Sequence, residues 1–150
     1  MIEKSLIDKL KDFGLNCAEK FLGEKNLQES VELHSIAIMG GWARCYFNPE
    51  DRIENHRDID IDIYFSPKAE KMGATCRKVN TQGYPTRIKN YYAGKDLDMA
   101  RIALQEPKSP DFAGDVRAYI RPRKYKKRMS RRAGSPMIFI YPALVPVKEL

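Results

Sequence analysis

The feature that most constrains this chain is the strict alternation of aspartate and isoleucine over residues 58–63. Successive side chains of a β-strand point to opposite faces, so the alternation predicts a strand with one apolar and one acidic face. The apolar face, which needs a hydrophobic layer beneath it, consists of Ile59, Ile61 and Ile63. The acidic face consists of Asp58, Asp60 and Asp62. Three adjacent carboxylates repel one another unless a cation or basic side chains neutralise them.

An apolar run that ends in two glycines precedes this strand. Residues 35–39 predict a buried strand, Gly40 and Gly41 a tight turn, and residues 42–47 a short helix. Glycines lack Cβ atoms, so their backbone can approach a phosphate and direct amides at it, aided by the positive end of the following helix. The alternative is an ordinary turn, after which Trp42 anchors the helix to the core.

The other patterns predict a small domain of mixed composition. Apolar residues at steps of three and four indicate an amphipathic helix over residues 2–22, weakened at Gly14. Ser66-Pro67 is typical of a helix start, and this helix should reach about residue 79. Further strands are expected at 85–92, 97–104 and 137–141, the first two joined by a turn at 93–96. We expect an α+β (mixed α/β) fold, with helices flanking a small mixed sheet.

The cysteines and the hydropathy indicate the compartment. The three cysteines, Cys17, Cys45 and Cys76, form no C-x-x-C pair, which argues against a disulfide scaffold or a zinc ribbon and favours a reducing setting. No apolar run approaches the roughly 20 residues that cross a membrane. We therefore expect a single cytoplasmic domain over residues 1–150 with no membrane partner.

Positive charge is concentrated in one segment. The formal net charge is +7, and residues 121–132 hold eight Lys or Arg and no acid. Such a run attracts phosphates, although a solvated loop is the alternative.

The paired acids favour a metal site. Two carboxylates one residue apart on one strand face lie roughly 6–7 Å apart and can share Mg²⁺, a cation that prefers oxygen ligands. An EF-hand loop starting at Asp58 is excluded, because its sixth and twelfth positions would be Ile63 and Ala69. Two alternatives stay open: an edge strand whose acids meet water and basic side chains, and the Asp-x-Asp of nucleotide-sugar glycosyltransferases, which normally lies in a larger domain.

The motifs together resemble those of a known superfamily. Gly40-Gly41-Trp42-Ala43, then Arg52, then residues 56–61 (His-Arg-Asp-Ile-Asp-Ile) resemble the signature of the DNA polymerase β-type nucleotidyltransferases. The likeness is closest to the aminoglycoside and lincosamide types. It implies a nucleotidyltransferase fold and transfer of a nucleoside monophosphate from a nucleoside triphosphate (NTP), such as ATP, to an acceptor hydroxyl, with release of pyrophosphate.

The resemblance also implies roles for individual residues. The catalytic, metal-binding acids would be Asp58, Asp60 and Asp98, with Asp96 as the fallback for Asp98. The nucleotide-binding residues would be Gly40, Gly41, Arg52, His56 and Arg57. Two Mg²⁺ ions are implied as cofactors, with Mn²⁺ as an alternative. Asp62 departs from the pattern, which has two acids on this strand, and leaves open which two bind metal.

Partners follow from the end of the sequence and from its charge. Members of this superfamily usually continue into a helical region that covers the acceptor, so we expect either a truncated chain or a cleft completed by another subunit, as in a homodimer. Aminoglycosides are polycations and match a charge of +7 poorly, whereas RNA suits it as acceptor. The competing hypothesis is a non-catalytic nucleotidyltransferase-like module that binds nucleic acid or acts as an antitoxin.

Overall fold

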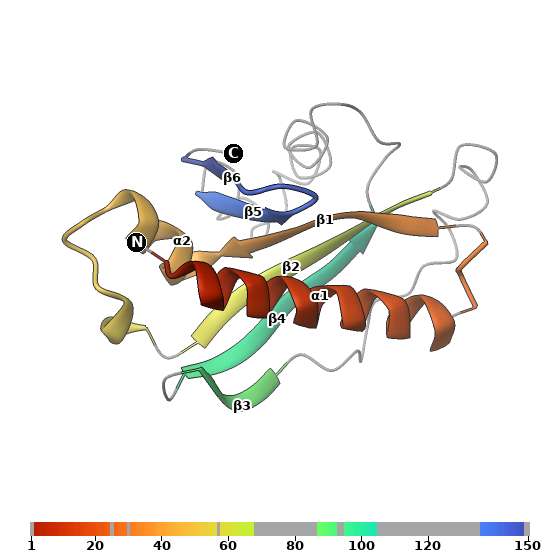
Figure 1. Cartoon of the computed structure of the whole chain (residues 1–150), viewed down its shortest axis with the longest axis horizontal. Helices are drawn as coiled ribbons and strands as arrows, with labels where there is room; N and C mark the ends of the chain where they lie inside the picture. Colours follow the sequence, from red (N-terminus) through yellow and green to blue (C-terminus); the bar gives the residue numbers. More distant parts are fainter. Residues whose placement is uncertain are drawn as a thin grey trace, which may run out of the picture.

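The computed structural model describes residues 2–24, 26–29, 31–56, 58–67, 87–92, 95–104 and 136–148, with the backbone alone at 31, 53, 66–67, 87–92 and 95–104. Its elements are α1 (Lys4–Glu24), β1 (Val31–Met39), α2 (Gly40–Phe47), η1 (Ile53–Asn55), β2 (Asp58–Pro67), β3 (Arg87–Tyr92), β4 (Lys95–Leu104), β5 (Met137–Tyr141) and β6 (Val145–Val147). Within the described residues, six strands form one sheet in the order β3-β4-β2-β1-β5-β6 (Figure 1). The expected α+β class is confirmed.

The aspartate–isoleucine strand β2 lies in the interior of this sheet. It pairs antiparallel with β1 on one side and parallel with β4 on the other. The interpretation of residues 58–63 as an exposed edge strand is therefore wrong. Because both neighbours satisfy its backbone groups, β2 is fixed in register, and each of its side chains is committed to one face.

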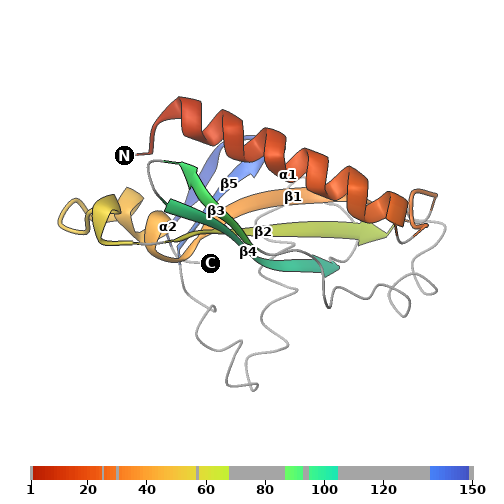
Figure 2. The same ribbon diagram turned by 90° about the horizontal axis from the view of Figure 1, so that it is seen from below.

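Helix α1 covers one face of the sheet (Figure 2). The isoleucine face of β2 meets this helix, and Ile59, Ile61 and Ile63 are fully buried in one cluster with the apolar stripe of α1. Burying each such side chain contributes roughly 1.5–3 kcal/mol. At the far end of the helix the rings of Phe21 and Phe65 stack, with centroids 5.1 Å apart. Packing against α1 therefore accounts for the isoleucines of the alternating pattern.

Gly14, which weakens the helix by propensity, lies where α1 crosses β1. A Cβ at this position would lie 2.7 Å from Cδ1 of Ile36. The missing side chain lets the helix approach the sheet closely, so close packing accounts for a residue that local propensity disfavours.

One local prediction is wrong. Ser66 and Pro67 do not start a helix, because they end β2 and pair with Glu32 and Val31 of a β1 that begins earlier than expected. Pro146 lies in β6, one of the two edge strands of the described sheet, where the lack of an N–H is tolerated.

Several predictions fall on residues that the structure does not describe. They include the helix from 68 to 79, the turn at 93–94, Cys76 and the basic run at 121–132. Among the helices that are described, none combines the length and the apolar character required to span a membrane.

Candidate active site

The bend between β1 and α2 lies against an aspartate of β2. Gly40 has a φ of +67°, a left-handed conformation that favours glycine, and it opens α2 directly after β1. A Cβ on Gly40 would lie 2.5 Å from Oδ2 of Asp60. The carboxylate therefore occupies the space that a side chain at Gly40 would need. Two motifs separated by 20 positions in the sequence meet at this point.

The glycines belong to the helix, whereas the sequence pattern placed them in a separate turn. Met39 precedes the helix in an extended conformation and makes no side-chain capping bond. The first amides of a helix lack partners within the helix, and they carry the positive end of its dipole. The bend thus combines backbone donors with a neighbouring carboxylate.

The three aspartates of β2 differ in their surroundings. Asp58 and Asp60 are partly exposed, whereas Asp62 is completely buried. The hydroxyl of Tyr64, two residues further along the same face, donates a 2.6 Å hydrogen bond to Oδ2 of Asp62. The sequence leaves open which two of these three aspartates bind metal. Asp58 and Asp60 are the two that solvent can reach, so the difference in burial favours this pair.

The strand β4 brings two further aspartates beside this pair. In the parallel ladder the Cα of Asp98 is the partner of Asp60, and that of Asp96 is the partner of Asp58. Neighbouring strands lie about 4.8 Å apart. The backbone of the third predicted acid is therefore directly adjacent to Asp60, while the side chains of Asp96 and Asp98 lie outside the described residues.

The loop before β2 carries three of the predicted nucleotide-binding residues. His56 is partly buried, and its ring lies against Gly41, where a Cβ would overlap the imidazole. Its Nε2 is 2.8 Å from Oδ1 of Asp51. Arg52 is exposed, and Arg57 lies outside the described residues. Of these three, the structure places His56 at the glycine bend.

A second cluster, which the sequence patterns did not indicate, lies beside His56. Cys45, Asp51 and His56 each offer one ligand atom, and these atoms all lie within 4.8 Å of one another. Burial raises the pKa of the Cys45 thiol, and the charge of Asp51 and its hydrogen bond with the thiol raise this pKa further. Cys45, Asp51 and His56 match no spacing motif in the sequence, because the fold of the loop between α2 and β2 brings them together.

Trp42 is a core residue. It is 2% exposed and belongs to the hydrophobic cluster beneath α1. This agrees with the interpretation of the tryptophan as an anchor that holds α2 against the sheet.

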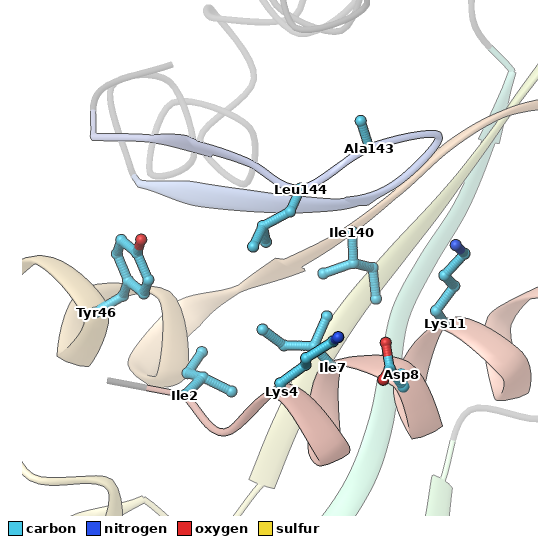
Figure 3. A pocket seen from close by; sticks show the side chains of 9 residues that line it. All are labelled: Ile2, Lys4, Ile7, Asp8, Lys11, Tyr46, Ile140, Ala143 and Leu144. Carbon is cyan, nitrogen blue, oxygen red and sulfur yellow. The ribbon is translucent and has the colours of Figure 1, made fainter.

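A cavity of about 410 Å³ has none of the β2 aspartates in its wall (Figure 3). It lies between the start of α1, Tyr46 of α2 and the β5–β6 connection, and its wall includes Ile7, Ile140 and Leu144. The charged residues at this cavity are Lys4, Asp8 and Lys11. With one acid beside two lysines, it lacks the carboxylate set that a divalent cation requires.

The donors on the acidic face of β2 fit a hard divalent cation. Asp58 and Asp60 are partly exposed carboxylates on one strand, and Asp60 lies against a bend with no side chain of its own. Mg²⁺ and Mn²⁺ prefer such oxygen donors and usually share their coordination sphere with phosphates.

Comparisons of the chain with protein-family models, with curated proteins and with solved structures return no match.

Proposed function

We propose that the chain is a metal-dependent nucleotidyltransferase of the DNA polymerase β type, with the corresponding nucleotidyltransferase fold. The observation that supports this most directly is the contact between the Gly40 bend and the Asp60 carboxylate. A nucleoside triphosphate held by the bend would have its phosphates beside a metal-binding acid. Nucleotidyl transfer requires this arrangement. The register that makes Asp98 the Cα partner of Asp60 supports the proposal of Asp98 as the third acid on the adjacent strand.

Each group has a defined role in this proposal. The backbone amides at Gly40 and Gly41 bind the triphosphate, and one side chain of the loop before β2 (Arg52, His56 or Arg57) neutralises it. Asp58 and Asp60 hold Mg²⁺, and Asp98 completes the site and accepts the proton of the acceptor hydroxyl. When bound, the cations stabilise charge on the attacking and leaving oxygens at the α-phosphate. Asp62, buried against Tyr64, supports the strand and does not bind metal.

The decisive experiment is a transfer assay. The protein is incubated with each labelled NTP, Mg²⁺ and either total RNA or a small-molecule pool, and label on an acceptor is measured. The Asp58→Asn, Asp60→Asn double variant should abolish labelling, whereas Asp12→Asn, at an exposed aspartate of α1, should leave it unchanged. Absence of labelling in the unaltered protein with every NTP and acceptor pool would contradict the proposal.

RNA is the acceptor class that the charge favours. A chain with net charge +7 attracts a polyanion, and an affinity based on phosphate contacts falls steeply as salt rises. Titration of labelled RNA at increasing salt tests this. An affinity independent of salt would remove RNA from the proposal without affecting nucleotidyl transfer itself.

The non-catalytic alternative rests on the same charge and predicts a different outcome. A nucleic-acid-binding or antitoxin module would bind RNA equally well after chelation of metal and in the Asp58→Asn, Asp60→Asn double variant, and would label no acceptor. The proposed enzyme would act in the cytoplasm. Light scattering of the purified protein tests the separate proposal that it is a homodimer.

A further inference from the structure

Three side chains with different metal-binding chemistry converge beside the proposed active site. Cys45 comes from the helix α2, Asp51 from the loop after it, and His56 from two residues before β2. Their donor atoms lie within 4.8 Å of one another. Donors around a tetrahedral ion are roughly 3–4 Å apart, so small side-chain movements bring all three to one centre.

The backbone around the cluster fixes two of its three members. The side chain of Asn48 accepts a 3.1 Å bond from the amide of Glu50, and the amide of Asp51 donates to the Asn48 carbonyl at 3.1 Å, which forms a tight turn that delivers Asp51. Gly41 leaves the space in which the His56 ring sits. The positions of Asp51 and His56 are thus set by features that do not depend on their bond to each other.

We propose that Cys45, Asp51 and His56 form a second metal site, which binds a borderline-soft divalent transition metal of the Zn²⁺ type. A thiolate and an imidazole select such ions, whereas Mg²⁺ prefers an all-oxygen set. Cys45 is 5% exposed, and the side chains of His56 and Asp51 are 21% and 24% exposed. The site is therefore closed on the cysteine side and open to solvent on the other, where water or another donor takes the fourth position.

Binding changes the protonation of the cluster in a defined way. The Cys45 thiol loses its proton to solvent as the sulfur–metal bond forms. The 2.8 Å bond between Nε2 of His56 and Asp51 gives way to separate bonds from each residue to the metal, and the proton between them leaves Nε2, so that the neutral imidazole keeps its one proton on Nδ1. The thiolate and the carboxylate balance the two charges of the ion.

The proposed second metal site does not require nucleotidyl transfer, although both proposals involve His56. His56 lies against Gly41 in the bend proposed to hold the triphosphate. A metal bound to its Nε2 fixes the ring and the loop before β2. Zinc binding without transfer, or transfer without zinc binding, would separate the two proposals.

The experiment uses Co²⁺ as a spectroscopic substitute for Zn²⁺ with the full chain. Cobalt bound to a thiolate gives a charge-transfer absorption, which we expect to saturate at one ion per chain and to disappear when Zn²⁺ is added. Cys45→Ser should abolish this band, and Cys17→Ser and Cys76→Ser should leave it unchanged. The Asp58→Asn, Asp60→Asn double variant should also retain it.

Zinc affinity, measured by competition with a chromophoric chelator, provides a second readout. Asp51→Asn and His56→Gln should each weaken binding by more than the roughly 10–100-fold lost when an outer partner of a metal ligand is removed. Circular dichroism verifies that these variants are folded. Absence of a cobalt–thiolate band in the unaltered protein, or a band that survives Cys45→Ser in a folded variant, would overturn the proposal.

Discussion

The two faces of β2 carry equally regular patterns, yet the structure treats them differently. On one face Ile59, Ile61 and Ile63 are all completely buried beneath α1 and are equivalent in their surroundings. On the other face, exposure falls from the partly exposed Asp58 and Asp60 to the fully buried Asp62. Burial is uniform where a helix covers the face and graded where the strand approaches the glycine bend. The comparison shows that aspartates of one regular repeat can differ in their exposure to solvent.

The largest expected effect separates Asp60 from Asp62. In the proposed enzyme, Asp60→Asn should lower the turnover number for nucleotide transfer by at least about 1,000-fold, because a metal ligand beside the transferred phosphate is lost. Asp62→Asn keeps an oxygen that can accept a hydrogen bond from the Tyr64 hydroxyl. The turnover number of this variant should therefore fall by less than about 10-fold. Rates are measured at saturating NTP. Equal losses in two folded variants would contradict the division of the acidic face.

The apolar face should respond in stability. Ile61→Ala removes a fully buried side chain from the layer under α1 and should lower the free energy of unfolding by about 2–5 kcal/mol. Urea denaturation measures this change. The same substitution at Ile7, a partly buried position on α1, provides the matched comparison and should cost less. A similar cost at both positions would mean that the isoleucine face does not form the centre of the core.

The sequence predicted these faces well because both signals are local. The period of two gave β2, and the period of three to four gave α1, whose predicted bounds differ by two residues at each end. Ser66-Pro67 failed because pairing with β1 extends the strand through a local helix-start signal. The cluster of Cys45, Asp51 and His56 could not be predicted, since its members share no spacing motif and meet through the turn at Asn48. The contact between Gly40 and Asp60 likewise arises from strand order, which periodicity does not determine.

The buried end of the acidic face should also show a stability effect. Tyr64→Phe removes the hydroxyl that donates to Asp62 and leaves the ring, so the packing is preserved. Removing one partner of a buried hydrogen bond costs roughly 1–3 kcal/mol, and the free energy of unfolding should fall by that amount. Urea denaturation at neutral pH measures it. Repetition in the Asp62→Asn background gives a double-mutant cycle, and additive effects would show that this bond contributes little.

The bend itself should produce the smallest change in stability and a separate change in activity. Gly40→Ala imposes a side chain at a φ of +67°, which costs about 1–2 kcal/mol, and its Cβ would force the Asp60 carboxylate to move. Gly14→Ala is the matched control, because its Cβ meets Ile36 in the core, on the α1-covered side of the sheet. Both variants should shift the melting temperature, but Gly40→Ala alone should lower nucleotide transfer and weaken Mg²⁺-dependent NTP binding. If Gly14→Ala reduced transfer as much as Gly40→Ala at a temperature where both are folded, the loss would reflect stability, and the contact between the bend and Asp60 would have no special role.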